Sequence, residues 1–229
     1  MALKTGNWRA FRNIPVFWIH QRTTNLDRSE LIFHITLNLF AAIVIFFILS
    51  IIGIFSVLWQ RIFIALILTR TFSWILNDHF WGGLQVSFSF VKNCGEERFC
   101  QYLIDVSKRL SECNAIYACF VYGSLVRNEF HRKSDLDVLY IKRSGFISTV
   151  SALSFAVRER VIALFARIPL DLYVGDSKDF LKRYRDDEIP IIIKDGDGSM
   201  VKKYPKHIPL EKFLQNFKHN KDGIIRIEE

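Results

Sequence analysis

The chain has 229 residues, of which half are hydrophobic, and it carries a formal net charge of +8 with a pI near 9.4. This length suits one globular domain, or one small domain with an attached segment, and excludes several large domains. The basic balance favours anionic partners such as nucleotides, nucleic acid or acidic lipid headgroups, without choosing among them.

A long apolar run follows a basic N-terminal segment, residues 1–30. Residues 31–60 contain no Asp, Glu, Lys or Arg, and Arg61 and Arg70 are the only charged residues from there to position 77. Since about 20 apolar residues span a bilayer core, residues 31–76 are predicted to form a membrane region. The run is too long, and starts too far into the chain, for a signal peptide.

Two geometries fit this membrane region. One is a single long, tilted helix, and the other is a hairpin of two helices that turns near Ser50 to Gly53. In the hairpin, Arg61 lies inside the second helix, where it must reach the interface or find a partner. The residues before the run predict a capped helix start, with Asn25 or Thr24 as the cap.

The pattern changes after the apolar run. Residues 77–95 are predicted to be a linker with a short edge strand in VSFSF, and residues 96–200 to be a small α/β domain. A basic tail, residues 201–229, contains an amphipathic helix around PLEKFLQNF. The elements predicted for the domain are a helix at 96–114, a strand at 115–123, a short helical turn at 124–130, a strand at 134–142, a helix at 146–168, a strand at 169–176, a helix at 177–188 and a strand at 189–197.

Three aspartates on two of these strands are the candidate metal ligands. Residues two apart on a strand face the same way, so SDLDVLY places the carboxylates of Asp135 and Asp137 side by side. Two carboxylates that close repel each other, and a divalent cation such as Mg²⁺ or Mn²⁺ removes the conflict. Asp171, flanked by leucines in PLDLYV, joins them if the two strands are neighbours. Three carboxylates can hold two metal ions about 4 Å apart, as in phosphoryl or nucleotidyl transfer.

The Gly123-Ser124 dipeptide is a candidate phosphate-binding turn, because it follows a predicted strand and opens a predicted helical turn. Glycine allows close backbone approach to a phosphate, and the amides of a helix N-terminus, with the Ser124 hydroxyl, can bind one. Arg127 can neutralise a leaving pyrophosphate. His131, Arg132 and Lys133 either contact phosphate or form a solvated turn.

The stretch YGSLVRNEFHRKSDLDVLYI resembles the minimal nucleotidyltransferases of the polymerase-beta-like nucleotidyltransferase superfamily, whose usual pattern is GS-x-A-R-G followed by SD-x-DL. The matching residues are Gly123, Ser124, Arg127, Ser134, Asp135 and Asp137. Asp171 matches the third acid in kind and order, and DDEIPIIIKDG resembles the closing segment. The resemblance covers residues 96–200, under half of the chain. Val126, Asn128 and Val138 stand where the family usually has Ala, Gly and Leu.

The resemblance implies an α/β (α+β) fold, a small mixed sheet with flanking helices, here preceded by one or two transmembrane helices. It implies transfer of a nucleoside monophosphate from an NTP, with ATP expected, to a hydroxyl. Asp135, Asp137 and Asp171 would hold two Mg²⁺ or Mn²⁺ ions, and Gly123, Ser124 and Arg127 would bind the nucleotide. Protein AMPylation of the toxin–antitoxin kind, antibiotic nucleotidylation and a non-catalytic nucleotide-responsive membrane component are the alternatives.

Charge and substrate together predict the orientation. The basic N-terminal segment favours the cytoplasm, and a domain that uses an NTP belongs there too, so an even number of crossings or a monotopic insertion is expected. This favours the hairpin, with the domain facing the cytoplasm. Expected partners are NTP, membrane lipid and an acceptor hydroxyl on a lipid-linked molecule, a glycan or a protein; nucleic acid is not expected.

The remaining polar residues give weaker expectations. Four cysteines are spaced too widely for a CxxC site and are expected to be free thiols. His34, inside the apolar run, is expected to be a buried hydrogen-bonded residue or a helix contact. Arg158 and Arg160 are expected to face solvent.

Overall fold

A computed structural model gives the arrangement of most of the chain. The structure describes residues 18, 27–53, 56–76, 79–88, 91, 94–127, 129–131, 133–175 and 189–221. The predicted helix at 177–188 and Asn128 lie outside these described residues.

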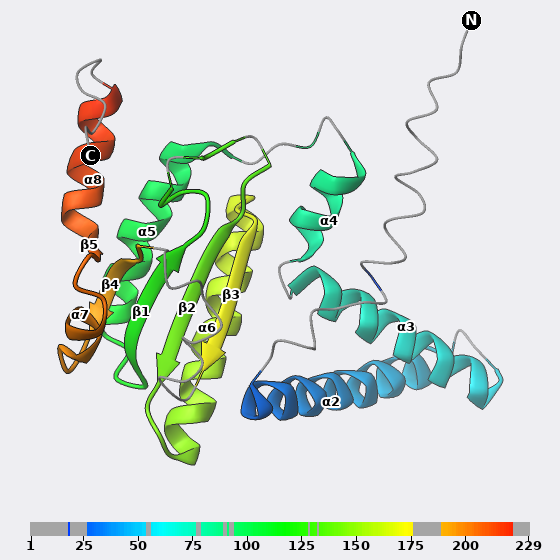
Figure 1. Cartoon of the computed structure of the whole chain (residues 1–229). Coiled ribbons are helices and arrows are strands. Elements are labelled where there is room, and N and C mark those ends of the chain that lie inside the picture. The colour runs from blue at the N-terminus through cyan, green and yellow to red at the C-terminus, as the bar shows by residue number, and fades with distance from the viewer. Residues whose placement is uncertain are drawn as a thin grey trace, which may run out of the picture.

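The described part of the chain contains one five-stranded mixed sheet in the order β3-β2-β1-β4-β5 (Figure 1). Strand β1 is antiparallel to both β2 and β4, whereas β2 pairs with β3, and β4 with β5, in parallel. The predicted mixed sheet with flanking helices is therefore confirmed. The strand bounds are Ile116–Tyr122 for β1, Leu136–Lys142 for β2, Leu170–Gly175 for β3, Ile191–Asp195 for β4 and Ile208–Pro209 for β5.

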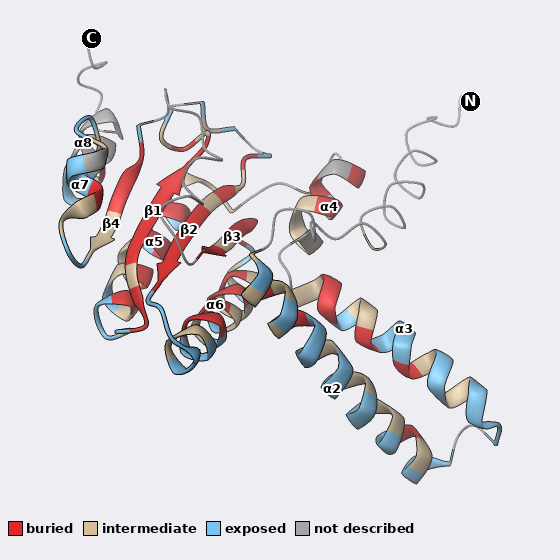
Figure 2. Cartoon of the chain, turned by 60° about the horizontal axis from the view of Figure 1, so that its bottom comes forward, coloured by how far each residue is buried: buried red, intermediate tan, exposed pale blue. Residues whose placement is uncertain are grey.

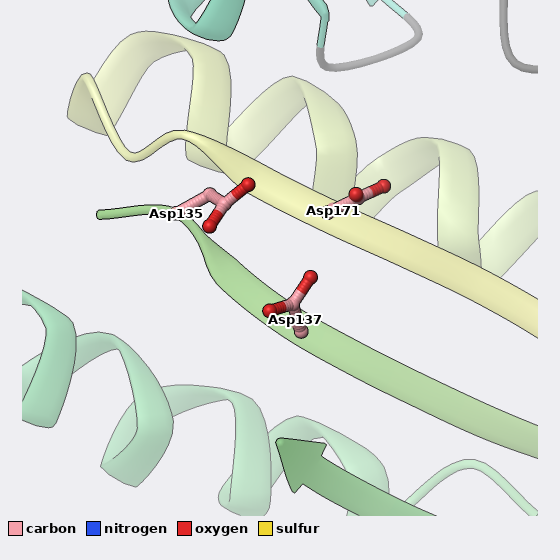
Figure 3. Close-up of side chains that lie close together, drawn as sticks. All are labelled: Asp135, Asp137 and Asp171. Atoms are coloured by element: carbon pink, nitrogen blue, oxygen red, sulfur yellow. The ribbon is translucent and has the colours of Figure 1, made fainter. Parts of the chain in front are cut away.

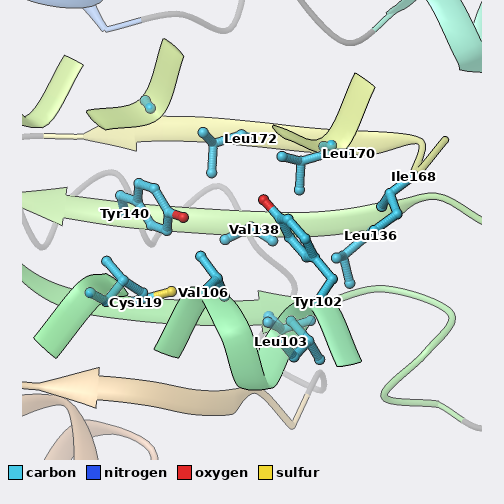
Figure 4. Packing of buried hydrophobic residues seen from close by; sticks show 14 of the residues in the cluster. Tyr102, Leu103, Val106, Cys119, Leu136, Val138, Tyr140, Ile168, Leu170 and Leu172 are labelled. Carbon is cyan, nitrogen blue, oxygen red and sulfur yellow. The ribbon is translucent and has the colours of Figure 1, made fainter. Parts of the chain in front are cut away.

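Two helices, α5 (Glu96–Ser111) and α6 (Phe146–Ala166), pack on one face of the sheet. The apolar face of α5, which includes Leu103 and Val106, is fully buried against strand residues such as Val138 (Figure 4). Helix α6 connects β2 to β3, which is the crossover that a parallel pair of strands requires. Burial of each large apolar side chain contributes about 1.5–3 kcal/mol, so this face is the main core.

The opposite face of the sheet carries a smaller apolar cluster. Phe120 and Leu139 are fully buried there beneath Met200 of α7 (Ser199–Lys203), a short helix that the sequence pattern did not predict. The amphipathic helix expected in the basic tail is α8 (Leu210–Lys221). The smaller cluster leaves one end of this face for polar side chains that β2 and β3 carry.

The apolar run forms a helical hairpin of α2 (Arg28–Ile52) and α3 (Leu58–Leu76), which extends away from the sheet (Figure 1). Gly53 ends α2 with a φ of 71°, a left-handed conformation that glycine adopts without strain. The predicted turn near this position is confirmed. The predicted cap was wrong: the cap of α2 is Asp27, whose carboxylate accepts a hydrogen bond from the Ser29 amide, the usual role of an acidic N-cap.

Most of the hairpin surface is apolar and open (Figure 2). Among the described residues, α2 is the one helix that is long and apolar enough to cross a membrane, judged by length and composition. Only 6% of its most apolar 18-residue window is buried, unlike the core helix of a soluble protein. A membrane anchor and a signal sequence both have this length and composition. In α3, Arg70 donates a hydrogen bond to the Trp18 carbonyl at 3.0 Å.

Part of the expected linker is helical. VSFSF, residues 86–90, was predicted to be an edge strand, but α4 (His79–Ser87) includes its first two residues, so the prediction was wrong there. Residues 89 and 90 lie outside the described part of the chain. The helix is fixed by tertiary contacts that a five-residue alternation does not encode. Phe80 packs edge-to-face on Trp74 of α3, and Trp81 donates a hydrogen bond to the Leu164 carbonyl of α6 at 3.0 Å. Helix α4 therefore connects the hairpin to the sheet domain.

All four cysteines are free, as predicted, and two of them should be unreactive in the folded protein. Burial raises the pKa of the Cys100 thiol to about 12 and that of Cys119 well above its usual value. Because the thiolate is the reacting form, we expect maleimide at pH 7.5 to leave both unmodified, and to label all four cysteines after denaturation. Intact-mass analysis of native and denatured protein measures this. Rapid modification of Cys119 in the native protein would contradict its burial.

Candidate metal centre

The three aspartates meet on the sheet as the sequence predicted. Parallel pairing of β2 with β3 places Asp137 opposite Asp171, and Asp135 lies two residues earlier on the same side. One carboxylate oxygen from each residue lies within 4.8 Å of the other two. Figure 3 shows the three side chains gathered over the start of β2 and β3.

Strand alternation aims these carboxylates away from the core. The neighbours Leu136, Leu170 and Leu172 are all buried in the main cluster under the helices, so the aspartates between them must face the other side. Asp171 is largely buried, with 9% of its surface exposed, and Asp137 is more open to solvent. The buried leucines therefore fix the backbone next to each carboxylate, and metal ligands need such support from the surrounding structure.

The donor set fits a hard divalent cation. Ionised carboxylates only accept hydrogen bonds, and three of them at this spacing would repel by roughly 3–4 kcal/mol per pair at an effective dielectric constant of 20. A divalent cation offsets that repulsion, and oxygen-only ligands suit Mg²⁺ or Mn²⁺. Beside them, the Tyr173 hydroxyl donates a hydrogen bond to Oδ2 of Asp171 at 3.4 Å.

The glycine turn lies directly beside the carboxylates. Tyr122 pairs with Asp137 across β1 and β2, so Gly123 follows just past that pair, with a φ of 87°. A Cβ atom at Gly123 would overlap Oδ2 of Asp137. Glycine is therefore required twice here, once for the backbone conformation and once for the space that it leaves beside the carboxylate.

The short helical turn predicted at 124–130 is present but shorter, at residues 124–127. Residues 124–127 form a turn in which the amides of Val126 and Arg127 both bond to the Gly123 carbonyl. The side chain of Leu125 is 1% exposed and belongs to the main core, so the chain turns inward rather than continuing as a helix. The Ser124 hydroxyl is buried and has no hydrogen-bond partner among the described residues. This orphaned donor is the polar group that the turn offers to a ligand.

The other motif residues have local partners. Arg127 donates from Nε to Glu129 at 2.8 Å, and both side chains are exposed. Ser134 is buried, and its hydroxyl accepts a hydrogen bond from the His131 amide at 2.9 Å, which closes the loop before β2. Val138, one of the family departures, fits the core at 1% exposure.

Sequence reasoning missed three residues near this centre. Tyr173 lies two residues after Asp171 on the same strand, so strand periodicity alone could have placed it on the carboxylate face. Arg160 was expected to face solvent but is buried at 4% exposure, together with Glu30 at 0%. The position of Arg160 on its helix could not reveal this burial, because its partner Glu30 lies 130 residues away in the sequence. Arg158 is exposed, as expected.

Comparison of the chain with models of protein families, with curated proteins and with solved structures finds no match.

Proposed function

We propose that this protein is a membrane-anchored nucleotidyltransferase that transfers a nucleoside monophosphate from an NTP to a hydroxyl group and releases pyrophosphate. One observation carries the proposal: three carboxylates from adjacent parallel strands converge within 4.8 Å. The positive-φ turn at Gly123, beside Asp137, supports it by providing a place for phosphate next to the metal ligands.

The residues of the site divide the reaction between them. Asp135, Asp137 and Asp171 would hold two Mg²⁺ or Mn²⁺ ions, which when bound stabilise charge on the attacking and leaving oxygens. Asp171 would orient the acceptor hydroxyl and take its proton as the new phosphoester bond forms. The Ser124 hydroxyl would donate to a phosphate oxygen. The exposed guanidinium of Arg127 would leave Glu129 to neutralise the departing pyrophosphate.

The hairpin suggests where the acceptor resides. Helix α2 has the length and composition of a membrane anchor, and both ends of the hairpin lie against the sheet domain, which would keep the site at the cytoplasmic surface of a bilayer. Tethering raises the effective concentration of any acceptor in the same membrane. A lipid-linked, glycan or membrane-protein hydroxyl is therefore the proposed acceptor, with ATP as the proposed donor.

Labelled ATP tests the proposal. Membranes containing the full-length protein, Mg²⁺ and α-phosphate-labelled ATP are expected to incorporate label into a lipid-extractable product and to release pyrophosphate. The same membranes with Asp135→Ala should incorporate none. Label in protein would instead identify an AMPylating enzyme, and nucleotide binding without transfer a non-catalytic component. Transfer that persists in Asp135→Ala would exclude the proposed site.

A further inference from the structure

Strand β3, which carries Asp171, lies at the edge of the sheet that the described residues form. An edge strand exposes a row of backbone N–H and C=O groups, and here two of them are bound by side chains instead of by another strand. Arg160 donates to the Leu172 carbonyl at 2.8 Å, and the Val174 amide donates to Oε2 of Glu30 at 3.3 Å. These two groups belong to the residues one and three positions after Asp171 on the strand.

The two side chains that bind this edge also bind each other. Arg160 donates from Nη2 to Oε1 of Glu30 at 2.8 Å, and their side chains are 5% and 0% exposed. The other guanidinium nitrogen contacts Nε2 of His34 at 3.0 Å. Since a guanidinium can only donate, the histidine nitrogen accepts. Both charges thus have specific partners, which a buried ion pair requires.

The pair comes from parts of the chain that are distant in sequence. Glu30 lies in the first turn of α2, the apolar anchor helix, whereas Arg160 lies on α6, the helix that leads into β3. The first turn of the anchor helix therefore supplies a carboxylate where a neighbouring strand would supply carbonyl oxygens. A buried ion pair is weak evidence for stability, and a fixed register is its best-attested role.

We propose that Glu30 and Arg160 are positioning residues for the metal centre, and that docking of the anchor helix on β3 holds Asp171 in register with Asp137. The inference rests on the proposed function and deepens it, because it makes the anchor a part of the site. A metal site needs its ligands held to within about 0.5 Å. Fixing the backbone at Leu172, one residue from the ligand, supplies that restraint.

A variant that lacks both Glu30 and Arg160 distinguishes a positioning role from the destabilisation caused by one buried charge without its partner. The double variant Glu30→Leu, Arg160→Met leaves neither charge alone in the interior, so the fold is expected to survive. Full-length protein in lipid nanodiscs is then compared by Mn²⁺ titration, by hydrogen exchange of the β3 peptide, and by transfer kinetics. We expect Mn²⁺ affinity and kcat each to fall about 10–100-fold, the range seen when groups that orient metal ligands are lost. KM for ATP should stay close to that of the wild type, and the Val174 amide should exchange faster.

The matched control is a second ion pair, between Glu159 of α6 and Arg109 of α5. Glu159 is fully buried and accepts hydrogen bonds from both Nε and Nη2 of Arg109 at 2.7 Å, so the contacts of this pair lie with α5 rather than with β3. Arg109→Met with Glu159→Leu should change thermal stability and leave Mn²⁺ affinity and Val174 exchange unaltered. If the first double variant fails to fold, Arg160→Lys keeps the charge but loses the two-pronged donor, and it should show the same changes to a lesser degree.

The outcomes separate the two proposals. Wild-type Mn²⁺ affinity in a folded Glu30→Leu, Arg160→Met variant would overturn the positioning role and leave the nucleotidyltransferase untouched. Equal losses in the control pair would also overturn it, because the effect would then be general destabilisation. A wild-type protein that binds no Mn²⁺ and transfers no nucleotide would remove the proposed function itself, and the positioning role with it.

Discussion

Replacement of Asp171 with asparagine is expected to lower nucleotidyl transfer by on the order of 10³-fold while the protein stays folded. The change keeps the shape of the side chain and removes one of three converging carboxylates. Metal ions supply several kcal/mol to such a reaction, and about 1.4 kcal/mol corresponds to a factor of ten in rate. Transfer measured with labelled ATP under saturating Mg²⁺ gives the change in kcat.

The same variant should change how the protein responds to metal. A ligand that binds only the folded state stabilises it by mass action, so Mg²⁺ or Mn²⁺ should raise the Tm of the wild type, and a chelator should reverse the effect. In Asp171→Asn this shift should shrink or vanish, and the metal-free Tm should equal or exceed that of the wild type because repulsion is relieved. Asp105→Asn, on α5, is the control and should retain the shift. A full metal-dependent shift in Asp171→Asn would argue against its role as a ligand.

The cluster of three aspartates could be predicted in part, because it follows from short-range rules. Alternation along the strands predicted the side on which Asp135 and Asp137 lie. The step that needed the structure was the parallel pairing of β2 with β3, which the sequence left as a condition. Once β2 and β3 are neighbours, a register that buries the leucines of both strands also places Asp171 opposite Asp137.

The predictions that were wrong concern contacts that sequence periodicity does not encode. Arg160 was expected to face solvent, but it is buried beside Glu30 of α2, which pairs with it. The helical turn predicted at 124–130 is shorter in the structure, where it covers residues 124–127 and Leu125 packs in the core. In both places a long-range contact outweighs the local preference.

Gly123→Ala is expected to abolish transfer and to weaken metal binding strongly, although it adds one methyl group. At a φ of 87° an alanine is strained by about 1–2 kcal/mol, and its Cβ would overlap the Asp137 carboxylate. The strain can be met by small backbone changes, but the overlap can be relieved only by moving Asp137 or the turn. Either movement separates the phosphate-binding turn from the metal ligands. Mn²⁺ titration and transfer kinetics of the full-length variant measure the loss.

Gly95→Ala distinguishes the two effects. Gly95 has a φ of 92°, close to that of Gly123, but among the described residues, apart from its chain neighbours, no atom lies within 4 Å of the position that its Cβ would take. It therefore carries the conformational strain without the overlap, and should reduce Tm by a similar amount while Mn²⁺ affinity and transfer stay near wild-type values. If both alanine variants lose transfer to the same extent, strain would explain the result, and the space beside Asp137 would have no specific role. If Gly123→Ala keeps full transfer, the turn lies too far from the reacting phosphate to be its binding site.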